Sequence, residues 1–188
     1  MKKTIGLDFG TSNTVLVEAD GNGNTQSLQF GTGADSVMSL ATVLSFLDRR
    51  PAKRPNPEAG PWAIRQFLES LGDVRFIQSL KSFVASPHFN GTGIYGDRYD
   101  FEALMVTFLT LALQKSAVPV VSEETRLIVG RPVAFAGHTP DDALAMARYR
   151  EAFKRAGFHD IQFVLEPVAA AFSFAQTLTQ DATILVTD

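Results

Sequence analysis

Three acidic residues stand at the ends of apolar, β-branched runs that are typical of buried strands. Asp8 ends the first run, Glu166 follows "IQFVL" (161–165), and Asp188 ends "TILVTD" (183–188). Parallel strands place their carboxyl ends at one edge of a sheet, so we expect these carboxylates to lie together. One such residue alone is more typical of a turn or a cap. Three together indicate a hydrated divalent cation, which accepts oxygen ligands directly or through water.

The turn after Asp8 has the residues that a phosphate site needs. In "DFGTSN" (8–13), Gly10 allows a close backbone turn, so that successive N–H groups can point at an anion. Thr11 and Ser12 add hydroxyls at the same place. Taken alone, such a motif is more often a plain hairpin turn, and the sequence contains no Gly-Lys-Ser/Thr of a Walker loop.

The first half of the chain predicts an antiparallel meander followed by an insertion. We expect strands at 4–10, 13–20 and 25–30, with a further strand at 40–47 and a proline-rich loop or insertion at 49–60. Pro61 is suited to the first position of a helix. Asp100 is suited to cap a second helix that runs to about Lys115 and is apolar nearly all round, so it should be buried.

The second half alternates strand and helix, which favours parallel pairing with right-handed crossovers. The expected strands are 125–130, 161–165 and 183–187, and the expected helices are 140–156 and 166–178. Thr139 is predicted to cap the first of these helices and Gly157 to end it. Together with the meander, these elements predict an α/β domain with a mixed sheet and two βαβ units.

Composition excludes several classes of function. The chain has 188 residues, 45% hydrophobic and 20% charged, and a formal net charge of −3. This charge gives no case for nucleic acid or an anionic membrane as a partner. The longest apolar run, 103–113, is too short to span a bilayer, and Asp8 interrupts the apolar stretch that a secretory signal would need. The absence of cysteine suits a reducing compartment, so we expect a cytoplasmic protein.

Three motifs resemble those of the actin-like ATPases, which include actin, sugar kinases, DnaK-type chaperones and bacterial filament proteins. "IGLDFGTSNT" (5–14) resembles their first phosphate loop, "LEPVAAAF" (165–172) their first connecting motif, and "TILVTD" the strand that opens their second phosphate loop. The resemblance implies a ribonuclease-H-like, actin-like ATPase lobe. Its core would cover about 1–35 and 116–188, with a smaller inserted subdomain at about 36–115. The second lobe would be absent, as in a trimmed chain.

Two further segments narrow the resemblance to the DnaK-type branch. "LIVGRPVAF" (127–135) and "REAFKRAGFHDIQFVLEPVAAAF" (150–172) look most like YegD-like chaperones, which lack the usual peptide-binding domain. "FIQSLKSFVA" (76–85) resembles the segment with the catalytic lysine, which implies that role for Lys81. Asn13 after Ser12 departs from DnaK, as does "AFAGHTPDD" (134–142), so the coupling arginine near that stretch is not carried over.

The resemblance implies an intact protein that binds ATP with Mg²⁺ and hydrolyses it to ADP and phosphate. Its partners would be nucleotide and, in the intact protein, unfolded clients or co-chaperones; the fragment alone would be inactive. A sugar or acetate-type kinase and a filament-forming ATPase are the alternatives. The implied catalytic residues are Lys81, Glu166, Asp188 and Thr11; the nucleotide would lie on Gly10, Thr11, Ser12 and Asn13, and the metal on Asp8, Asp188 and Glu166, mostly through water.

Overall fold

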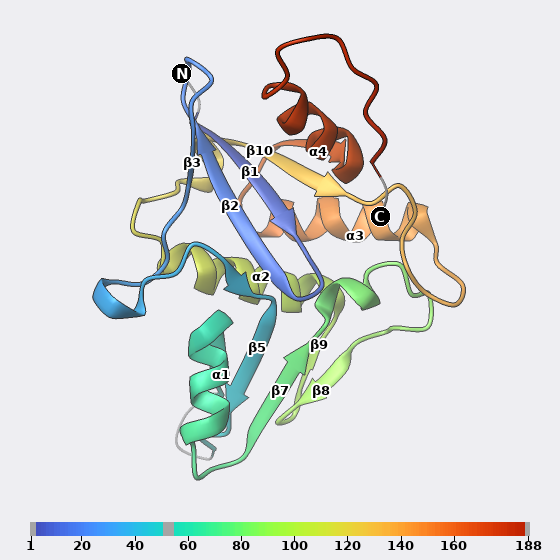
Figure 1. Ribbon diagram of the computed structural model, residues 1–188. Helices are drawn as coiled ribbons and strands as arrows, with labels where there is room; N and C mark the ends of the chain where they lie inside the picture. The colour runs from blue at the N-terminus through green and yellow to red at the C-terminus, as the bar shows by residue number, and fades with distance from the viewer. Residues whose placement is uncertain (1–2, 51–54, 187–188) are drawn as a thin grey trace.

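The main sheet has the mixed pairing that the sequence predicts. The computed structural model describes residues 3–50 and 55–186. Its main sheet runs in the order β11-β10-β1-β2-β3, and the short β4 also pairs with β2 (Figure 1). β1 pairs antiparallel with β2 and parallel with β10, which pairs parallel with β11. The strands are β1 (Lys3–Phe9), β2 (Asn13–Ala19), β3 (Thr25–Ser27), β4 (Leu40–Ala41), β10 (Thr125–Arg131) and β11 (Asp160–Leu165).

The register brings the carboxyl ends of three strands to one edge. Leu7 of β1 lies opposite Val129 of β10, and Val129 lies opposite Phe163 of β11. Each of these strands ends two residues further on, at Phe9, at Arg131 and at Leu165. The residues directly after β1 and β11 are therefore delivered to the same edge of the sheet.

Helices lie on both faces of the main sheet. α2 (Phe101–Gln114) and α3 (Asp142–Arg155) pack against each other on one face, and α4 (Glu166–Ala175) lies on the other (Figure 1). Asp100 caps α2 as expected, because its side chain accepts a hydrogen bond of 2.6 Å from the Ala103 N–H. α4 buries no residue fully, in contrast to the other two.

A second, smaller sheet lies beside the first (Figure 1). β5 (Val43–Leu47) is its central strand, with antiparallel partners β6 (Asn56–Ala59) and β7 (Val74–Gln78). The remaining elements are α1 (Gly60–Glu69), the hairpin of β8 (Thr92–Ile94) and β9 (Asp97–Tyr99), and three 3₁₀ turns. These turns are η1 (Gly33–Asp35), η2 (Leu80–Phe83) and η3 (Ser122–Glu124), which directly precedes β10.

The predicted final strand is not formed in the described part of its range. Residues 181–186 are in no strand, and Leu185 and Val186 are exposed. Within 3–50 and 55–186, the main sheet ends at β11 and no strand follows α4 to complete a second βαβ unit. The run 183–186 is apolar enough for a strand, but a strand also needs a hydrogen-bonding neighbour, and sequence pattern does not supply one.

Other boundaries also differ from the sequence predictions, and the helix predicted over 166–178 ends at Ala175. The expected strand at 40–47 is divided between β4 in the main sheet and β5 in the second sheet, and the strand at 25–30 ends at Ser27. The stretch 49–60 contains β6 and the start of α1. α3 is capped by Asp141, not Thr139, because the Asp141 carboxylate accepts from the Leu144 N–H at 2.9 Å.

The predicted division into a core and an inserted subdomain stays a prediction. β4 lies inside the range 36–115 and yet pairs with β2 of the main sheet. α2 contacts α3 on one side and β5 and β6 on the other.

No helix within 3–50 or 55–186 combines the length and apolar character that crossing a bilayer requires.

The aromatic cluster around Tyr149 joins α3 to the sheet. Its buried ring contacts the rings of Phe9, Phe101, Phe135, Phe153 and Phe163, with centroids 5.9–6.4 Å apart. Burial also raises the pKa of the Tyr149 hydroxyl. The cluster links β1, α2, α3 and β11, so it is a central part of the core.

We expect Tyr149→Ala to lower the free energy of unfolding by about 3–5 kcal/mol, because it leaves a cavity among five rings. Tyr149→Phe should cost far less, since it keeps every ring contact. Urea unfolding of the three chains, followed by circular dichroism, measures both values. Equal losses in the two variants would contradict the packing role.

Candidate functional site

Asp8, Lys81 and Glu166 come together at the carboxyl edge of the main sheet. The Lys81 Nζ donates a hydrogen bond of 2.8 Å to the Glu166 Oε1, although the two residues are 85 positions apart. Their side chains are only 15% and 30% exposed. Asp8 lines the same hollow as Glu166, and the charges of Glu166 and Lys81 both act on its pKa. The site thus has two carboxylates and one ammonium group.

Glu166 has its place because the neighbouring strand carries a glycine. Glu166 is the first residue of α4, directly after β11. A Cβ on Gly130 of β10 would lie 3.2 Å from the Glu166 Cγ, closer than ordinary contact. Gly130 is not among the site residues that the motifs predict, although a glycine inside a strand is a signal of close approach.

Lys81 comes from the smaller part of the fold. It lies in η2, just after β7, and Ser79 at the start of that turn has a left-handed backbone with φ 57° and ψ 40°. Such a conformation is unfavourable for a residue with a side chain. Contact between Lys81 and Glu166 therefore depends on how the second sheet is placed against the first.

The pKa of Asp8 is raised above its ordinary 3.8. Partial burial is the largest cause, repulsion from Glu166 adds to it, and the positive charge of Lys81 opposes both. Asp8 still keeps an exposed side, so solvent screens these effects. Two carboxylates near one ammonium leave a local excess of negative charge.

The turn beside Asp8 is a two-residue hairpin loop made of Thr11 and Ser12. The Gly10 N–H donates to the Asn13 carbonyl at 2.9 Å, which closes the turn. A Cβ at Gly10 would lie 2.4 Å from the Asn13 carbonyl oxygen, so a larger residue would force the turn open. Gly10 thus shapes the turn, and its own N–H is used inside it.

The side chains of this turn face solvent, and hydrogen bonds from Thr42 fix its backbone and the start of β2. Thr11, Ser12 and Asn13 are exposed. The Ser12 carbonyl accepts from the Thr42 N–H at 2.8 Å, and the Thr42 and Thr14 hydroxyls form a buried hydrogen bond, also 2.8 Å long. The exposed hydroxyls are thus available to a ligand on a turn that is held at its base.

Asp188, the third predicted carboxylate, lies outside the described residues, so its distance from Asp8 stays a prediction. Across the ranges 3–50 and 55–186, no three His, Asp or Glu side chains lie close enough to hold a metal ion among themselves. Asp8 and Glu166 supply the hard oxygen atoms that Mg²⁺ prefers, and this ion usually keeps several of its waters. These residues fit a hydrated ion better than a bare one.

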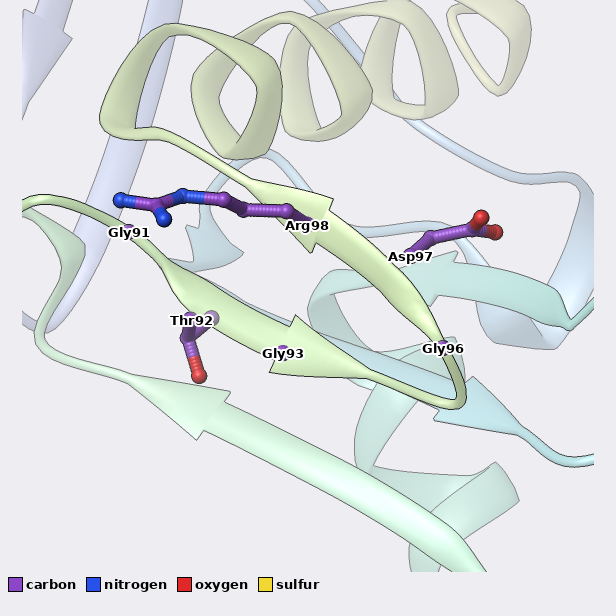
Figure 2. A pocket seen from close by; sticks show the side chains of 6 residues that line it. All are labelled: Gly91, Thr92, Gly93, Gly96, Asp97 and Arg98. Atoms are coloured by element: carbon purple, nitrogen blue, oxygen red, sulfur yellow. The ribbon is translucent and has the colours of Figure 1, made fainter.

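A hollow of about 540 Å³ opens on the face of the sheet that bears Asp8. It is lined by β1, β2, β10, β11 and α4, with Asp8 and Glu166 as its acidic residues. Another hollow, of about 350 Å³, lies along the β8–β9 hairpin. There Thr92, Asp97 and Arg98 point in different directions (Figure 2), so they do not converge on a ligand.

Comparisons with known proteins bear on the fold and on the relatives of this sequence. No protein-family model matches the chain. The chain is 24% identical over 203 residues to the chaperone protein DnaK of Cyanophora paradoxa, covering 100% of this chain and 31% of that protein. It also resembles the solved structure of a non-polymerising MamK mutant bound to AMPPNP, with a TM-score of 0.52, 18% identity, and coverage of 93% of this chain and 44% of MamK.

The chain has the actin-like ATPase fold. Its sequence is similar to that of a DnaK chaperone, which agrees with the resemblance of its motifs. It spans about a third of the DnaK relative and less than half of MamK, so it corresponds to only one part of such proteins. The described site residues lie at the carboxyl ends of the strands of this fold or beside them.

We expect Asp8→Asn to stabilise the chain at neutral pH, by less than about 1 kcal/mol because Asp8 is partly exposed. The folded state binds the Asp8 proton more tightly than the unfolded state does, so stability falls as pH rises from 3.8 through the raised pKa. The variant should lose this dependence, and its advantage should vanish below pH 3.8. Urea unfolding across pH measures this. A variant that is less stable than wild type at pH 7 would contradict the electrostatic account.

Proposed function

We propose that the chain is the first lobe of the nucleotide-binding domain of a DnaK-type, YegD-like chaperone, and that the intact protein hydrolyses ATP in the cytoplasm. The observation that carries the proposal is the contact between Lys81 and Glu166, next to Asp8 and the Gly10–Asn13 turn. This arrangement gives a phosphate group donors on one side and carboxylates on the other. Similarity to DnaK over the whole chain favours the chaperone branch over a kinase or a filament protein.

Charge balance supports nucleotide that arrives with a cation. Asp8 and Glu166 with Lys81 carry a formal charge of −1, from two carboxylates and one ammonium. A polyphosphate is itself strongly negative, so these groups alone would repel it. Magnesium, when bound, would neutralise phosphate charge, and Asp8, Glu166 and Asp188 would orient its waters.

The remaining roles are assigned by position. The hydroxyls of Thr11 and Ser12, with nearby backbone N–H groups and the Asn13 side chain, would hold phosphate oxygens. Lys81 would place its ammonium near the γ-phosphate and the attacking water, with Glu166 fixing its direction. Phosphoryl transfer needs mainly positioning and charge neutralisation, which these groups supply. Unfolded clients and co-chaperones are proposed only as partners of the intact protein.

In the intact protein, Lys81→Ala and Asp188→Asn should each lower ATP turnover by about 10²–10³-fold. Each variant removes one charged side chain that helps to stabilise the transition state. Phosphate release under saturating ATP and magnesium measures this. Lys154→Ala, on the exposed face of α3, is the matched control and should keep wild-type turnover. Wild-type turnover in both site variants would refute the assignment.

The 188-residue chain by itself should bind ATP far more weakly than the intact protein. In this proposal the adenosine pocket and the second glycine loop belong to the other lobe, so the chain offers only part of the contacts. Isothermal calorimetry with ATP and magnesium is the direct test. A dissociation constant in the low micromolar range would show that this lobe is sufficient and would contradict the proposal.

A further inference from the structure

One buried arginine holds the segment that carries Lys81. Arg148 of α3 is only 9% exposed. Its Nη1 donates to the carbonyls of Phe83, Val84 and Ser86 at 2.9, 3.0 and 3.0 Å, and its Nη2 donates to that of Phe89 at 2.7 Å. A single guanidinium thus gathers four carbonyls from the stretch that begins at the end of η2.

Arg148 occupies a place where packing alone would favour an apolar residue. It lies on the buried stripe of α3 with Ala145, Tyr149 and Ala152. A buried charge is costly unless it is well hydrogen-bonded, and an apolar side chain of similar size is often no less stable. The rigid fork of arginine, with five N–H donors, is the group that can serve four acceptors at once. We therefore infer that an arginine stands here because it can bind the backbone of residues 83–89.

Arg148 is linked to the backbone of Lys81 through Val84, by one hydrogen bond on each side. The Val84 N–H donates to the Lys81 carbonyl at 3.3 Å, and the Val84 carbonyl accepts from Arg148. The Asp141 N–H, at the start of α3, also donates to the Ala85 carbonyl at 2.9 Å. η2 itself has four residues and begins at the left-handed Ser79, so it has little means of fixing its own position.

The same helix also fixes the strand that carries Asp8. Tyr149 follows Arg148 in α3, and its ring packs on Phe9, the neighbour of Asp8 in β1, with centroids 6.2 Å apart. Adjacent residues of α3 thus set the places of both Lys81 and Asp8. We propose that Arg148 is a positioning residue, which acts through Lys81 and sets the distance of its ammonium from Asp8 and Glu166. This rests on the proposed function, in which Lys81 acts on the phosphate.

The test uses the intact protein with Arg148→Gln and with Arg148→Lys. We expect Arg148→Gln to lower kcat by about 10²-fold, as misplacement by about 1 Å can do, with nucleotide affinity nearly unchanged. Arg148→Lys should lose less, because an ammonium keeps three donors but not the fork. Arg155→Gln is the matched control: this exposed arginine of α3 pairs with Glu151 and Asp100, away from 83–89.

A double-mutant cycle separates positioning from a general loss of structure. In a Lys81→Ala background, the Arg148 variants should cause no further loss of kcat in single-turnover assays. A merely structural role would give the same loss in both backgrounds and would overturn the proposal. If Arg148→Gln does not fold, Arg148→Lys decides by the same cycle.

Hydrogen exchange gives a second readout that does not depend on activity. Amides of residues 80–89 should exchange faster in Arg148→Lys than in wild type or in Arg155→Gln. Unchanged exchange there, or unchanged kcat in an active protein, overturns this proposal alone. Absence of ATP turnover in the wild-type intact protein overturns the proposed function and this proposal with it.

Discussion

The contact between Lys81 and Glu166 sets the demands on the rest of the structure. It joins a 3₁₀ turn of the smaller part of the fold to the first residue of α4, with 2.8 Å between the charged atoms. A hydrogen bond of this length tolerates little error, so the second sheet must hold a fixed place against the first. Gly130 allows the same contact, because its missing side chain leaves room for the Glu166 side chain over the sheet.

α3 is the element that makes this placement possible. It contacts α2, its Tyr149 packs among rings from β1 and β11, and its Arg148 binds the backbone at the end of η2 and beyond it. The helix is thus in contact with both parts of the fold at neighbouring residues. A shift of α3 would move Asp8 and Lys81 together, and this keeps their relative geometry more constant than independent supports would.

The strands themselves, the hairpin at Thr11–Ser12 and the Asp100 cap were predictable because each depends on residues close in sequence. The meeting of the parallel strand ends followed from the general behaviour of parallel sheets. One prediction failed and one feature was missed, because distant parts of the chain decided both outcomes. The run 40–47 is mostly apolar, and its division between two sheets depends on which strands lie nearby. Arg148 could have been noticed as a charge on an apolar helix face, but its four acceptors are a property of the folded loop.

Unfavourable local features gather at the carboxyl edge, and the core compensates for them. Asp8 holds a carboxylate beside Glu166, and Ser79 adopts a left-handed backbone just before the Lys81 turn. Each lowers the stability of the folded chain, and such features persist only where the surroundings fix them. Here the surroundings are the rings around Tyr149 and the carbonyls on Arg148. The surrounding structure thus holds the site residues in an arrangement that is locally unfavourable. Such an arrangement is expected at a site that binds a charged ligand.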